Sequence, residues 1–132
     1  MTIARPMALL SLVAAGVLLL ACGSEGGETS SDRSGEAKSP QTVAVVMKDN
    51  VFEPKALTVA AGQTVTFSLK NEGANLHNMH VVSDDVDPKN AMSTPIEGGK
   101  TDQLVVKFAK KGTFKFQCDL HTPDMAGTIT VQ

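Results

Sequence analysis

Residues 103–118 read QLVVKFAKKGTFKFQC, a stretch in which apolar and polar side chains alternate on both sides of a Lys-Lys-Gly segment. The members of the apolar set recur at every second position: Leu104, Val106, Phe108, Phe114, Phe116 and Cys118. A period of two is typical of a β-strand that buries one face. The stretch therefore predicts two antiparallel strands joined by a tight turn at Lys110-Lys111-Gly112.

Similar alternation predicts further strands before and after this stretch. They cover residues 41–48, 57–59, 64–70, 76–82 and 127–131. With about seven short strands and no segment of helical period, the expected fold class is an all-β sandwich or barrel in one domain. Residues 83–100 are rich in Asp, Pro and Gly, and they predict a long surface loop with one helical turn.

The N-terminal residues have the pattern of a targeting segment. Residues 1–21 contain a single charge, Arg5, followed by an apolar run too short to favour a membrane-spanning helix. The ending Leu-Leu-Ala-Cys22 resembles the lipobox of bacterial lipoproteins, which implies cleavage of the signal peptide and lipidation of Cys22. After Cys22, residues 23–40 are almost all small, polar or charged. Residues 22–40 are therefore predicted to be a lipidated cysteine and a disordered tether, and the folded domain covers residues 41–132.

Charge and cysteine content exclude several classes of function. Loss of Arg5 with the signal peptide changes the formal charge from −2 to −3, which argues against a nucleic-acid partner. If Cys22 carries lipid, Cys118 has no partner for an intramolecular disulfide in a compartment that favours disulfides. The unpaired Cys118 is therefore a candidate functional residue.

Three metal-ligating side chains lie within eight residues of the predicted connection between the last two strands. They are Cys118, His121 and Met125. Two imidazoles, one thiolate and a weak axial thioether are the ligands of blue copper electron-transfer sites. A second histidine is needed, and the remaining histidines are His77 and His80.

The Cys-x2-His-x3-Met pattern, together with His77-Asn78, resembles the cupredoxins, the family of plastocyanin, azurin and amicyanin. The resemblance covers residues from about Gln41 to the C-terminus and implies a Greek-key β-sandwich or barrel with one type 1 copper ion. It implies His77, Cys118, His121 and Met125 as copper ligands and Asn78 as the residue that steadies the cysteine loop.

His80 remains the alternative ligand. Neighbouring side chains alternate along a strand, so His77 and His80 face opposite sides and should not bind the same ion. We favour His77. The segment 84–100 and the extra histidine have no counterpart in the family pattern.

The predicted function is non-enzymatic electron transfer between extracytoplasmic redox proteins in a bacterial cell envelope, by a monomer attached to the membrane through its lipid. A catalytic zinc site would keep an open position for water, and this donor set is soft and nearly closed. A two-copper site would need a second cysteine beside Cys118. Two alternatives remain: a lipoprotein that buffers or delivers copper, and a metal-free β-sandwich for surface interaction.

Overall fold

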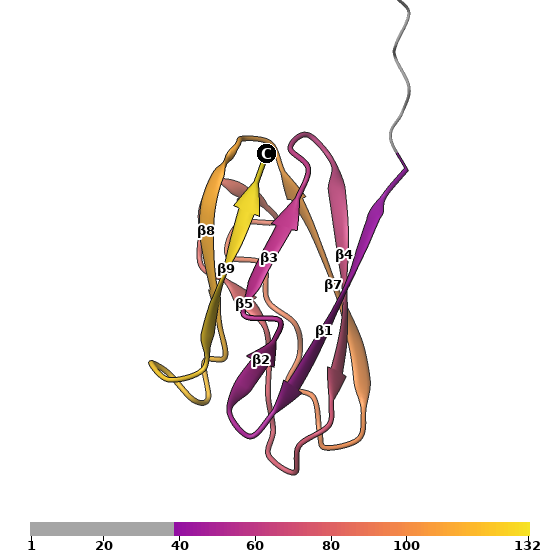
Figure 1. Cartoon of the computed structure of the whole chain (residues 1–132), viewed down its shortest axis with the longest axis vertical. Helices are drawn as coiled ribbons and strands as arrows, with labels where there is room; N and C mark the ends of the chain where they lie inside the picture. Colours follow the sequence, from indigo (N-terminus) through magenta and orange to yellow (C-terminus); the bar gives the residue numbers. More distant parts are fainter. Residues whose placement is uncertain (1–38) are drawn as a thin grey trace, which may run out of the picture. The chain divides into compact units, whose positions relative to one another are not determined.

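The computed structural model describes residues 39–132, which form an all-β domain (Figure 1). Nine strands lie in this range: β1 (Gln41–Lys48), β2 (Val51–Glu53), β3 (Ala56–Val59), β4 (Thr64–Asn71), β5 (His80–Val81), β6 (Val86–Asp87), β7 (Thr101–Phe108), β8 (Gly112–Gln117) and β9 (Ala126–Val131). The described residues contain no helix. The prediction of an all-β sandwich is confirmed.

The strands form two sheets. One sheet has five strands in the order β2-β1-β4-β7-β6, and the other has four in the order β3-β9-β8-β5. Pairing is mostly antiparallel, but β1 pairs with β4, and β3 with β9, in parallel. The chain therefore crosses repeatedly between the sheets, and residues distant in sequence meet at the ends of the sandwich.

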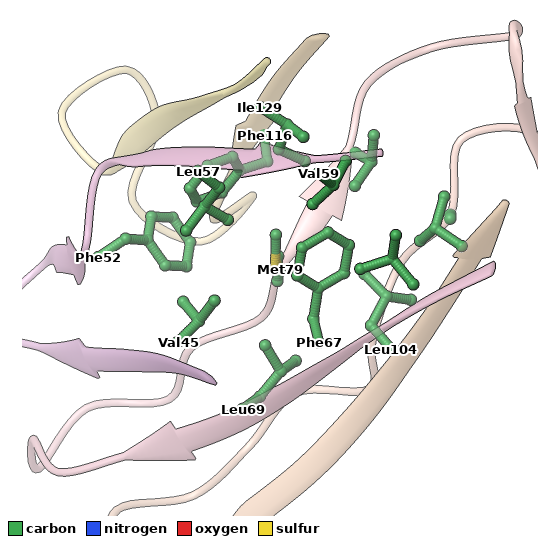
Figure 2. Packing of buried hydrophobic residues seen from close by; sticks show 14 of the residues in the cluster. Val45, Phe52, Leu57, Val59, Phe67, Leu69, Met79, Leu104, Phe116 and Ile129 are labelled. Atoms are coloured by element: carbon green, nitrogen blue, oxygen red, sulfur yellow. The ribbon is translucent and has the colours of Figure 1, made fainter. Parts of the chain in front are cut away.

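The core lies between the two sheets (Figure 2). Each long strand contributes every second residue, as the alternation predicts; Val65, Phe67 and Leu69 of β4 are all fully buried. The rings of Phe52 and Phe116 meet edge to face with centroids 4.9 Å apart. Such aromatic packing fixes β8 rigidly against the opposite side of the core.

Three short elements differ from the predicted strands. β2 and β6 were not predicted, and the strand expected over residues 76–82 is regular only at His80–Val81. These elements have two or three residues each, too few to show a period of two.

The expected surface loop at residues 83–100 is confirmed only in part: the segment is largely irregular and exposed, but it contains no helical turn and part of it is buried. Ala91, Ser93 and Ile96 are buried, and the backbone of residues 91–96 bonds to that of residues 77–81. Ile96 N donates to His77 O at 2.7 Å, and Ser93 N donates to Met79 O at 2.9 Å. Residues 91–96 therefore lie beside His77 and bond to residues 77–81 through isolated bridges, without forming a regular strand.

The predicted signal peptide, the lipidated Cys22 and most of the tether lie outside the described residues. Between residues 39 and 132 no helix is long and apolar enough to cross a membrane.

Candidate metal centre

Two connections at one end of the sandwich bring the candidate ligands together. His77 lies between β4 and β5, while Cys118, His121 and Met125 lie between β8 and β9. Figure 1 shows the β8–β9 connection at the lower end of the domain, away from the C-terminus. Cys118 follows the last residue of β8 directly, so the sheet fixes where its side chain begins.

His77, Cys118 and His121 form a compact donor cluster. Their ligand atoms all lie within 4.8 Å of one another. Cys118 Sγ is 3.9 Å from His77 Nδ1 and 3.5 Å from His121 Nδ1. His77 and Cys118 are fully buried, whereas His121 is half-buried.

The two sulfur–nitrogen separations fit a metal ion bound by the thiolate and each imidazole. With metal–sulfur and metal–nitrogen distances of about 2.3 and 2.1 Å, tetrahedral to trigonal angles place sulfur and nitrogen roughly 3.6 to 3.8 Å apart. The two observed distances lie close to this range. One soft thiolate and two imidazoles form the core of a blue copper donor set.

Met125 is fully buried and its backbone is tied to the cysteine. Cys118 N donates to Met125 O at 3.0 Å, and Met125 N donates to His121 O at 3.0 Å. His121 N also donates to Cys118 O at 3.2 Å. These bonds close the ligand loop into a compact turn, while the axial role of Met125 stays a prediction.

The electrostatic environment keeps His77 neutral. Burial lowers its pKa, and the neighbouring His121 lowers it further, while Asp49 raises it by a smaller amount. A neutral imidazole has the free lone pair that metal binding requires. A lowered pKa therefore favours ligation over a wider pH range.

Asn78 joins the two connections. Its backbone N–H points at Cys118 Sγ, with nitrogen and sulfur 3.5 Å apart, and its side-chain Oδ1 accepts from Asp119 N at 2.9 Å. An N–H donor at sulfur stabilises the thiolate, and the side-chain bond holds the cysteine loop in place. Asn78 thus lies where the sequence analysis expected a steadying residue.

The structure places His80 away from the donor cluster. Its Nδ1 lies 3.0 and 3.1 Å from the two carboxylate oxygens of Asp119. A carboxylate only accepts, so His80 Nδ1 carries the proton and donates. The cluster of ligand atoms contains His77 and not His80.

Asp119 is the functional-site residue that sequence reasoning missed. Its carboxylate also accepts from Gln117 Nε2 at 2.8 Å and from Asn78 Nδ2 at 3.1 Å. Burial alone raises the pKa of Asp119, but the bonds from Gln117, His80 and Asn78 together lower it below its usual value. Its position directly after Cys118 was the available signal, but its partners at residues 78 and 80 are distant in the sequence.

A family model, curated proteins and solved structures all match this chain. A family model described as a cupredoxin-like domain matches residues 11–131. Plastocyanin A/B of Petroselinum crispum is 36% identical over 87 residues, covering 61% of this chain and 87% of that protein. Auracyanin A, a blue copper protein from Chloroflexus aurantiacus, superposes with a TM-score of 0.62 at 26% identity, covering 70% of this chain and 99% of that chain.

A second kind of relative has a name linked to copper resistance. The copper-resistant cuproprotein CopI of Pseudomonas aeruginosa is 36% identical over 74 residues, which cover 54% of this chain. The match spans only 41% of the length of CopI.

Proposed function

The chain belongs to the cupredoxin-like family, and on this premise we propose that it carries single electrons between redox proteins outside the cytoplasm, using one copper ion. In this proposal His77, Cys118 and His121 bind the ion and Met125 is the weak axial ligand. Copper supplies a one-electron couple. We assign a carrier and not an enzyme because a thiolate, two imidazoles and a thioether form a soft and nearly closed donor set.

The observation that carries the proposal is the grouping of the buried His77 and Cys118 with the half-buried His121 on a β scaffold. The backbone N–H and C=O groups of His77, Cys118 and His121 are all hydrogen-bonded, so we expect little reorganisation when the charge of the site changes. A donor set held in this way suits fast electron exchange.

In this proposal electrons leave the copper site through the half-buried ring of His121. Leu120 beside it is 51% exposed, giving the end of the domain an apolar residue next to a ligand. We propose that a redox partner contacts this end. His121→Gly should damage the site and slow electron exchange; unchanged exchange kinetics in this variant would contradict the assignment.

The first test is spectroscopy of the purified full chain loaded with Cu(II) in detergent, beside Cys118→Ser. We expect an intense visible band and narrow copper hyperfine splitting in the electron spin resonance spectrum, both lost in the variant. A pale, ordinary Cu(II) spectrum in the unaltered chain would count against a thiolate-bound type 1 site.

Copper buffering or delivery is the second candidate, favoured by the similarity to CopI. Delivery requires a labile ion, so rapid loss of copper to a competing chelator would favour this role. Slow loss together with rapid oxidation and reduction favours electron transfer. Monomeric state and attachment to a bacterial envelope membrane through lipid on Cys22 remain parts of the proposal.

A further inference from the structure

A groove runs along the outer side of β8, beside the candidate metal centre. Its volume is about 430 Å³. One wall is formed by Val82 and Ser83, which follow the edge strand β5. The other is formed by the Lys110–Gly112 turn and by Thr113, Phe114, Lys115 and Gln117 of β8.

The groove has a positive rim. Lys110 is paired with Asp85, with Nζ and Oδ1 2.9 Å apart. Lys111 and Lys115 are exposed, and within residues 39–132 neither forms an ion pair. Two unneutralised charges therefore border the groove, although the chain as a whole has a formal charge of −2.

Two of the lining residues are apolar. Val82 is 44% exposed, and Phe114 is only partly buried against the core. Apolar side chains bordered by polar and charged ones are common in protein interfaces. The groove therefore combines contact area with charge that can steer an approaching partner.

The groove also reaches the residue that precedes Cys118 in the chain. Gln117, one of its lining residues, is bonded directly to Cys118, and its side chain donates to Asp119. The end of the domain near His121 differs in charge, because the exposed residues Asp119 and Asp124 are acidic. An anionic surface is therefore attracted to the side of the domain and repelled from this end.

We propose that the groove along β8 is the docking site for an acidic surface of a redox partner, and that electrons pass there through Gln117 and Cys118. This inference rests on the proposed electron-transfer function and names the charge of one partner. Lys111 and Lys115 contact the partner's carboxylates, and Val82 and Phe114 form the apolar contact.

The test uses the copper-loaded full chain and two small one-electron oxidants of opposite charge. One electron passes from the reduced protein to hexacyanoferrate(III), giving hexacyanoferrate(II), or to tris(phenanthroline)cobalt(III), giving the cobalt(II) complex. In Lys111→Glu/Lys115→Glu at low ionic strength, the rate with the anionic oxidant should fall about three- to tenfold and the rate with the cationic one should rise. Both differences should disappear at high salt.

The matched control is Lys55→Glu/Lys107→Glu, which makes the same change in net charge at exposed positions that do not line the groove. It should change both rates much less. Equal effects of the two double variants would overturn the groove assignment. So would a groove variant that alters only binding to phosphatidylglycerol vesicles, because the rim would then bind membrane.

The outcomes separate the inference from its premise. The visible spectrum of each variant reports whether the metal site is intact. Fast exchange with both oxidants, at rates insensitive to the groove charges, would contradict the docking site alone. Failure of the unaltered copper protein to exchange electrons with either oxidant would contradict the proposed function itself.

Discussion

At the residue scale, Asp119 connects the two ligand-bearing connections. Its carboxylate accepts hydrogen bonds from Gln117, which ends β8, and from Asn78 and His80, which lie before and at the start of β5. The ligand candidates could be found from the sequence because Cys118, His121 and Met125 are close together in it. Asp119 could not, because a single acidic residue gives no pattern and its partners are fixed only by the pairing of β5 with β8.

Replacing Asp119 by Asn should destabilise the copper-free protein by about 1 kcal/mol at pH 7, since an amide is a weaker acceptor than a carboxylate. The folded-state pKa of Asp119 is lowered, so its contribution is present above the unfolded pKa and is lost as the pH falls through the folded value. The difference between the two proteins should therefore shrink on acidification. Urea unfolding at a series of pH values from 7 down to 3 measures it.

Asp124→Asn is the control, because Asp124 is exposed in the same loop and its side chain has no hydrogen bond among the described residues. It should leave stability nearly unchanged at every pH. A stability difference for Asp119→Asn that stays constant across the acid range would rule out the ionised carboxylate as its source.

At the element scale, β8 and β9 set the position of Cys118. Long strands such as β4, β7 and β8 were predictable because a half-buried strand imposes a period of two on its side chains. The segment 91–96, which supports His77, was not. This segment is held mainly by backbone hydrogen bonds and by one side chain, Ser93, whose Oγ accepts from Met79 N at 3.0 Å. Such bonds leave no regular hydrophobic pattern in the sequence.

Gly127 of β9 lies opposite Phe116 of β8, where the two strands approach closely. A Cβ added there would lie 2.4 Å from an atom of the Phe116 ring and 2.5 Å from Lys55 O, and a backbone oxygen cannot move aside easily. Gly127→Ala should therefore destabilise the protein by about 1 to 3 kcal/mol through overpacking. The change is measured by denaturant unfolding of the copper-free protein.

Thr130→Ala provides the comparison on the exposed face of β9. This change should alter stability by no more than about 0.5 kcal/mol. If Gly127→Ala were equally mild, Phe116 would have room to move and the close approach of the strands would not be required.

At the scale of the whole molecule, a metal ion in the donor cluster would join two separate connections of the sandwich. His77 belongs to the β4–β5 connection and Cys118 to the end of β8, 41 residues later. The ligands meet in this arrangement only when both sheets are formed. Binding energy is therefore added to folding energy, provided that the unfolded chain binds copper weakly.

Copper should consequently raise the thermal midpoint of unfolding, and the rise should depend on His77 and not on His80. At a free copper concentration 1,000 times Kd the gain is about 4 kcal/mol, which corresponds to a shift of at least about 10 °C for a domain of this size. His77→Gln should lose most of the shift and His80→Gln should keep most of it. Measuring each variant with and without copper removes the direct effect of the substitution on folding.

The reverse result, with His80→Gln losing the shift and His77→Gln keeping it, would transfer the ligand role to His80. The two connections would then have to pack differently around the bound ion.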